Sequence, residues 1–226
     1  MDPDYNRNLV EEMNRYYEAR TPWHDQYMSY TSAARMLELH QPIVRSIEAQ
    51  LRCDRALELA CGTGNWTGIL AQWATTVDAI DRSPSSLQLA MEKTRGLDTI
   101  SYIQADVYDL GEDLQSYDLI FSADLISHVP YGLLPDFLRS MSERLAKGGS
   151  AVFIDMSSNE YFENEPSYFD SEGNRISDRS LPDGSVFRVV KNFPDEPTLR
   201  PIAERNFARF SLRSFPDLER WMIVLG

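Results

Sequence analysis

The middle of the chain alternates short apolar segments with amphipathic ones, and this alternation constrains the fold more than any other feature. Five segments have the length and composition of buried strands: "RALELA" (55–60), "TVDAID" (76–81), "ISYIQADV" (100–107), "YDLIFSAD" (117–124) and "SAVFIDM" (150–156). The intervening residues 66–74, 83–96 and 135–149 have helical spacing, with Ser83 as the N-cap of the second helix and Gly148 at the end of the third. Strands that alternate with helices form a mostly parallel sheet covered on both faces. We therefore predict an α/β fold.

The segments on either side of this alternation complete the predicted layout of one domain. Helical spacing in residues 8–20 and 33–51 predicts a helical leader, or lid, over residues 1–50. Residues 51–155 form the predicted core, and residues 196–226 a helix followed by a strand pair. Residues 157–185 are rich in acids, aromatics and turn residues without sustained periodicity, so we expect an irregular excursion within a cap insertion over 156–195.

The charge of the chain excludes several classes of partner. The 35 acidic residues outnumber the 22 basic ones and give a net charge of -13, which repels nucleic acids and anionic membrane surfaces. The two cysteines are too few for a disulfide framework, and the first residues lack the basic and apolar regions of a signal peptide. We expect a cytoplasmic protein that acts on a small molecule. The sequence does not indicate an oligomeric state.

The stretch "ELACGTG" (58–64) joins the first predicted strand to the next helix through a turn with bare backbone. Such a turn brings N–H groups close to a ligand at the carboxyl edge of the sheet, where nucleotide-like cofactors bind. Asp81 and Asp106 end the next two strands, where they can meet a ribose and an adenine edge. A tight turn also needs glycine without any ligand, so the turn alone is compatible with a purely structural role.

Taken together, "ELACGTG", "AID" (79–81), "QADV" (104–107) and "LAKGGSAVFID" (145–155) resemble the motifs of class I S-adenosylmethionine-dependent methyltransferases. The resemblance implies a Rossmann-like, mostly parallel seven-stranded sheet and S-adenosylmethionine as the cofactor. Ala60 stands where many members of the family have glycine. The cofactor-binding residues that the resemblance and the motif positions predict are Arg20, Glu58, Ala60, Gly62, Gly64, Trp66, Asp81, Arg82, Ser83, Asp106, Val107 and Ala123.

Other functions that use the same sheet edge fit the sequence less well. A dinucleotide dehydrogenase needs G-x-G-x-x-G, whereas Gly68 falls one place late for that pattern. A cofactor-binding module without catalysis is a further alternative. Base-directed methyltransferases carry an N/D-P-P-Y/F-like motif where this chain has "SADLISHVP". We predict no metal, because Asp124 is a candidate ligand without a companion and the histidines are scattered.

His128 follows the fourth predicted strand and is the candidate catalytic residue. An imidazole at this edge can orient or deprotonate a nucleophile near neutral pH. The alternative is that His128 caps a helix or packs under the loop. A base would be required if the methyl acceptor were a phenol, an amine or a thiol.

A closer resemblance lies in "YYEAR", "LISHVP" and "RSLPDGSVFRVVKNF". These stretches resemble a bacterial subgroup that includes the phosphonate O-methyltransferase of dehydrophos biosynthesis, which implies methylation of an oxygen on a small acid. Arg179, Arg188 and Lys191 occupy its basic positions, and we predict that they bind substrate together with His128 and Tyr27. Pairing with neighbouring acids is the alternative. Because strand residues alternate, Arg188 and Lys191 are expected on opposite faces.

Overall fold

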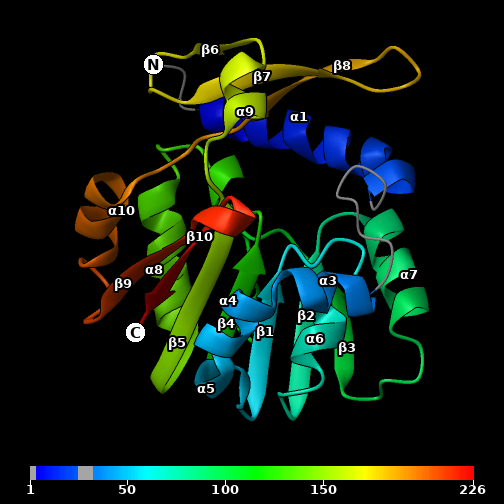
Figure 1. Ribbon diagram of the computed structural model, residues 1–226, viewed down its shortest axis with the longest axis vertical. Coiled ribbons are helices and arrows are strands. Elements are labelled where there is room, and N and C mark those ends of the chain that lie inside the picture. Colours follow the sequence, from blue (N-terminus) through cyan, green and yellow to red (C-terminus); the bar gives the residue numbers. More distant parts are fainter. Residues whose placement is uncertain (1–3, 25–32) are drawn as a thin grey trace.

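A seven-stranded sheet forms the centre of the computed structural model, which describes residues 4–24 and 33–226 (Figure 1). The strand order is β3-β2-β1-β4-β5-β10-β9, with β1 to β5 parallel and β10 antiparallel to both of its neighbours. This arrangement confirms the predicted fold class. The bounds are β1 (Arg55–Leu59), β2 (Thr76–Asp81), β3 (Ile100–Gln104), β4 (Tyr117–Ala123), β5 (Leu145–Met156), β9 (Phe210–Phe215) and β10 (Arg220–Leu225).

Helices cover both faces of this sheet, which explains why its strands are apolar throughout. Ile120 and Phe121 are neighbours on β4 and point to opposite faces, yet both are fully buried. Ile120 packs in one core cluster with Phe137, whereas Phe121 packs in another with Ile69. The first face carries α8 (Leu134–Arg144) and α10 (Glu196–Ala203); the second carries α3 (Ala33–Leu39), α4 (Gln41–Ser46), α5 (Glu48–Leu51), α6 (Thr67–Leu70) and α7 (Pro84–Lys93).

The predicted helix ends are right for α7 and wrong for α8. The Ser83 hydroxyl accepts a hydrogen bond from the Ser86 amide at 2.9 Å and caps α7, as expected. In contrast, α8 ends at Arg144 rather than at Gly148, and the chain enters β5 directly. A Cβ on Gly149 would lie 2.8 Å from the Tyr117 carbonyl oxygen, so the chain passes close to β4 at this point. Glycine serves this approach rather than a helix cap.

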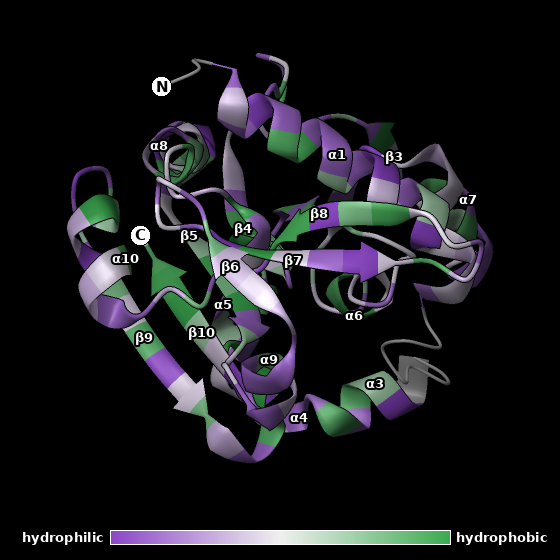
Figure 2. Ribbon diagram, turned by 90° about the horizontal axis from the view of Figure 1, so that it is seen from above, coloured by the Kyte–Doolittle hydropathy of each residue, from purple (hydrophilic) through white to green (hydrophobic). Residues whose placement is uncertain are grey.

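A second layer, the cap, lies over the carboxyl ends of the parallel strands (Figure 1). It consists of α1 (Tyr5–Arg20), α9 (Glu160–Asn164) and an antiparallel sheet of β6 (Ser167–Phe169), β7 (Arg175–Ser180) and β8 (Val186–Val190). Figure 2 shows α1 alongside β8, and Leu9 and Met13 pack there against Val189. The predicted irregular excursion over 157–185 is therefore wrong in part, because it contains α9, β6 and β7 between its loops.

The N-terminal leader contributes to both layers. Its first helix, α1, belongs to the cap and continues into a short 3-10 helix (Thr21–Trp23), whereas α3, α4 and α5 pack on the central sheet. The predicted division of the chain at residues 50, 155 and 195 stays a prediction. In the described ranges, every helix is too short or too polar to cross a membrane.

Candidate active site

A cavity of about 700 Å³ lies between the carboxyl edge of the central sheet and the cap. Its walls come from the ends of β1 to β5, from α1 and from the segments around α9 and β7. The sequence-predicted residues that line it are Arg20, Glu58, Ala60, Gly62, Trp66, Asp81, Arg82, Asp106, Val107, Ala123, His128, Arg179 and Lys191.

The turn after β1 has backbone conformations that favour glycine. Ala60, Gly62 and Gly64 all have positive φ angles, of 50°, 55° and 81°. Among the described atoms, nothing lies within 4 Å of the Cβ position of Gly62, so this part of the turn leaves room for a ligand. A Cβ on Gly64 would lie 2.9 Å from Ala90, so Gly64 packs the turn against α7 and does not line the cavity; its predicted contact with the cofactor stays a prediction.

Asp81 ends β2 with both carboxylate oxygens held by backbone amides. Its Oδ2 accepts a hydrogen bond from the Gly62 amide and its Oδ1 one from the Ser83 amide, each at 2.8 Å. Each oxygen keeps a further lone pair for a ligand hydroxyl. Burial raises the pKa of Asp81 and the two amides oppose this rise. The geometry fits the ribose of the predicted cofactor, and Ser83, also predicted to bind it, instead caps α7 outside the cavity lining.

Asp106 is joined to α1 through an arginine. Its Oδ2 accepts a hydrogen bond from Arg82 Nη1 at 3.0 Å, and Arg82 Nη2 in turn contacts Glu11 Oε1 of α1 at 2.8 Å. The other oxygen of Asp106 accepts a bond from the Tyr108 amide at 2.9 Å. This chain of contacts fixes α1 over the end of β3.

His128 is fully engaged at the other end of the cavity. Its Nδ1–H donates to the Val190 carbonyl oxygen, which leaves Nε2 to accept the Tyr17 hydroxyl at 2.9 Å. Burial lowers the pKa of His128 well below its usual value, and the nearby Lys191 and Arg179 lower it further. The imidazole is therefore neutral and its acceptor nitrogen is in use, which favours a positioning role over a base.

Lys191 lies just beyond β8 and is buried with a carboxylate. Its Nζ donates to Ser127 Oγ at 2.8 Å and lies 3.4 Å from Asp155 Oδ1. Burial lowers the pKa of Lys191, and Asp155 opposes this. Because Asp155 is on β5, this pair joins the cap segment to the central sheet.

The two predicted arginines lie in different places. Arg179 lines the cavity, 3.3 Å from Glu165 through its Nε, and its side chain is 17% exposed. Arg188 is 44% exposed and lies 2.7 Å from Glu12 of α1, outside the cavity lining formed by the described residues. The structure therefore does not bring Arg188 together with Arg179 and Lys191, because its side chain points to α1. Tyr27 lies outside the described residues.

Sequence reasoning missed several polar side chains of this region. Tyr17, Asp155 and Glu165 line or border the cavity but were not among the predicted site residues, although Asp155 ends the quoted stretch "LAKGGSAVFID". "YYEAR" was a weak signal for Tyr17. Asp124, weighed as a metal ligand, pairs with Arg220, and the described part of the chain holds no group of three or more candidate ligands.

Comparison with known proteins agrees with this geometry. A methyltransferase domain family matches residues 56–149. The structure of DhpI with SAH superposes with a TM-score of 0.77 at 26% identity and covers 96% of each chain. The structure of DhpI with SAM and HEP superposes with a TM-score of 0.78 at 27% identity, over 96% of this chain and 97% of the DhpI chain.

Curated relatives match over a shorter stretch. The demethylmenaquinone methyltransferase of Staphylococcus carnosus (strain TM300) is 24% identical over 160 residues, which span 67% of this chain and 63% of that protein. The corresponding enzyme of Staphylococcus aureus (strain MRSA252) is 29% identical over 106 residues, spanning 46% of this chain and 43% of that protein. The chain thus covers less than two thirds of the length of these relatives. It contains a methyltransferase domain over residues 56–149 and resembles class I S-adenosylmethionine-dependent methyltransferases in its fold and in its glycine turn.

Proposed function

We propose that this methyltransferase transfers the methyl group of S-adenosylmethionine to an oxygen of a small acid, with a phosphonate as the first candidate. The observation that carries the proposal is the pair of cations, Arg179 and Lys191, in the cavity beside a histidine that is neutral and engaged. The likeness to DhpI, solved with SAM and HEP at 27% identity, supports the same acceptor class.

The cofactor supplies a strongly electrophilic methyl group when it is bound. The residues of the chain then have mainly to position the reactants: Asp81 and the turn at Gly62 would hold the nucleoside, and Arg179 with Lys191 would orient the acid. An acceptor that is already an anion needs no base. This agrees with His128, whose Nε2 already accepts the Tyr17 hydroxyl and whose ring would align the acceptor rather than deprotonate it.

The remaining parts of the proposal concern partners and location. We infer a small-molecule acceptor and neither nucleic acid nor membrane, because of the net charge of -13. Cys53 and Cys61 are both free thiols, which favours the reducing cytoplasm.

The test is a screen for release of S-adenosylhomocysteine with small phosphonates, carboxylates, phenols, amines and thiols. With the best anionic acceptor, Arg179→Met should lower kcat/KM roughly ten- to hundred-and-fifty-fold, the effect of losing a charged hydrogen bond. Arg188→Met, outside the cavity lining, is the matched control and should change kcat/KM little.

The pH profile separates the acid from its rivals. With an acid acceptor, the rate should stay flat above the pKa of the acceptor, and His128→Ala should lower it by less than the roughly 10²- to 10⁴-fold expected for loss of a general base. Turnover of phenols or thiols alone, with a large His128→Ala effect and no Arg179→Met effect, would contradict the proposal.

A further inference from the structure

The carboxylate of Glu165 lies between two arginines of the cap. Its Oε2 accepts a hydrogen bond from Ser177 Oγ at 2.8 Å and lies 3.2 Å from Arg175 Nη1. Its Oε1 lies 3.3 Å from Arg179 Nε. Burial alone would raise the pKa of Glu165, but Arg179, Ser177 and Arg175 together hold it below its usual value. Glu165 is therefore an anion shared by the two guanidinium groups.

The two sides of this carboxylate are held differently. Hydrogen bonds anchor Oε2, whereas Arg179 Nε is buried without a hydrogen-bond acceptor in correct geometry among the described residues. The contact between Glu165 and Arg179 Nε is thus electrostatic rather than a hydrogen bond. Glu165 therefore reduces the positive potential of the Arg179 guanidinium, which lines the large cavity.

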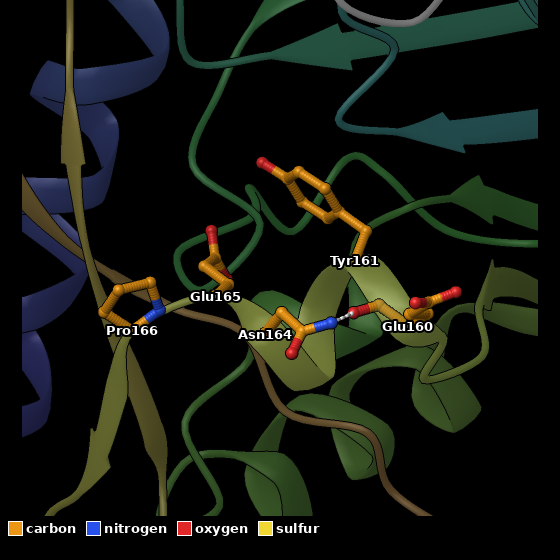
Figure 3. A pocket seen from close by; sticks show the side chains of 5 residues that line it. All are labelled: Glu160, Tyr161, Asn164, Glu165 and Pro166. Atoms are coloured by element: carbon orange, nitrogen blue, oxygen red, sulfur yellow. Dashed lines mark hydrogen bonds between the residues drawn. The ribbon is translucent and has the colours of Figure 1, made fainter.

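Glu165 also stands where two cavities meet. It lines the large cavity that contains Arg179, and it lines a second cavity of about 480 Å³ around α9. Figure 3 shows this second cavity, with Glu165 between Pro166 and Tyr161, and Tyr161 likewise lines both cavities. An acceptor held by Arg179 would therefore be bound in the immediate neighbourhood of the Glu165 carboxylate.

We propose that Glu165 is a positioning residue that limits how strongly Arg179 binds the acceptor anion, and so selects the charge of the acceptor. This inference rests on the proposed methylation of a small acid. The attacking oxygen loses charge during methyl transfer, so a cation that binds it too strongly stabilises the bound acceptor more than the transition state. Glu165 counters this effect by neutralising part of the charge of Arg179.

The inference predicts a division between KM and kcat that a purely structural role would not produce. Glu165→Gln leaves side-chain size unchanged and removes the negative charge. For an anionic acceptor, KM should fall roughly five-fold or more, since Arg179 regains its full charge at short range. The kcat should not rise, and an uncharged acceptor should show no change. Loss of a structural contact would instead raise KM and lower the melting temperature.

The experiment measures anion binding directly by calorimetry on the full chain saturated with S-adenosylhomocysteine. The probes are methylphosphonate, acetate and the uncharged dimethyl methylphosphonate. Glu163→Gln, an exposed residue of α9 with the same charge change, is the matched control, and Glu165→Asp keeps the charge should the Gln variant fold poorly. We expect tighter binding of an anionic probe to Glu165→Gln alone, with a steeper salt dependence. Tighter binding of methylphosphonate would indicate a phosphonate acceptor, and tighter binding of acetate would indicate a carboxylate acceptor.

Each other outcome has a defined meaning. If the unmodified protein binds an anionic probe but Glu165→Gln binds it equally or more weakly, the role of Glu165 is refuted and the proposed function stands. If neither protein binds an anionic probe, the acceptor class is refuted and the role of Glu165 with it. An equal gain in Glu163→Gln would assign the effect to overall charge and would also refute the inference.

Discussion

Glu58 offers a test of the site that depends on protonation alone. Glu58 lines the cavity, is 2% exposed and has one oxygen, Oε2, without a hydrogen-bond partner among the described residues. Burial raises its pKa from 4.5 to about 8; the nearby Thr67 hydroxyl opposes the rise and the charge of Asp81 adds to it. The folded protein should therefore hold Glu58 protonated at neutral pH.

This shift makes the free energy of unfolding depend on pH with a definite sign. In the unfolded chain, Glu58 loses its proton near pH 4.5, whereas in the folded chain it keeps it up to about pH 8. Between these values folding takes up a proton, so stability falls as pH rises, by about 1.4 kcal/mol per unit. From pH 5.5 to pH 7.5 this amounts to about 2.7 kcal/mol. Below the unfolded pKa the effect is absent.

Glu58→Gln should remove this dependence, because an amide resembles the protonated carboxyl and does not titrate. Denaturant unfolding at a series of pH values should show the variant gaining stability relative to the unmodified protein as pH rises from about 5 to about 8. Glu112→Gln, at an exposed position, controls for the change in net charge. Parallel stability curves for the protein and Glu58→Gln would show that Glu58 is ionised in the folded state.

Three further predictions test the cofactor site, the cap contacts and the cap itself. Asp81→Asn should weaken S-adenosylmethionine binding by about 2–3 kcal/mol, fifty-fold or more, since charge-assisted bonds are lost; unchanged affinity by calorimetry would contradict its role. Lys191→Met should destabilise the fold by about 3–5 kcal/mol, because it leaves the Asp155 carboxylate buried without its cation. Adding Asp155→Asn should restore part of the lost stability, and equal unfolding free energies of the single and double variants would contradict a stabilising Lys191–Asp155 ion pair. Amides of α9 should become more protected from hydrogen exchange with S-adenosylhomocysteine and acceptor bound, and identical protection would argue against a closing cap.

The central sheet could be predicted because its signals are local. Short apolar runs such as 117–124 are buried on both faces, and the turn around Gly62 follows directly from the end of a strand. The cap could not be predicted in the same way. The β7 segment "RISDRS" alternates apolar and polar residues only in part, since Arg175, half-buried, and Ser177, buried, contact Glu165 rather than an apolar neighbour. A local signal did exist in Asp183-Gly184, a hairpin turn between β7 and β8.

The sequence did not predict which basic residues of the cap reach the cavity. Arg179 and Arg188 lie in the same basic stretch, and nothing in their local sequence distinguishes them. The pairing register of β7 and β8 determines which arginine faces the cavity, because it places Arg179 opposite Phe187 and Arg188 opposite Asp178. Successive strand residues face opposite ways, so one arginine reaches the cavity while the other reaches Glu12 on α1. The local sequence therefore does not predict which arginine faces the cavity, because this depends on how β7 and β8 pair.

The acceptor end of the site is built across the boundary between the two layers. The Asn192 amide donates to the Ser127 carbonyl oxygen at 2.7 Å, His128 donates to the Val190 carbonyl, and Lys191 pairs with Asp155. Each contact joins the end of β8 or the residues after it to the loop after β4 or to β5, so the cap is attached to the core through polar groups that are themselves buried. Buried polar groups must be paired, and such pairs are specific about geometry. The contacts that hold the cap in place therefore also orient Lys191 and His128, whereas the cofactor end, with Asp81 and Gly62, is built within the core.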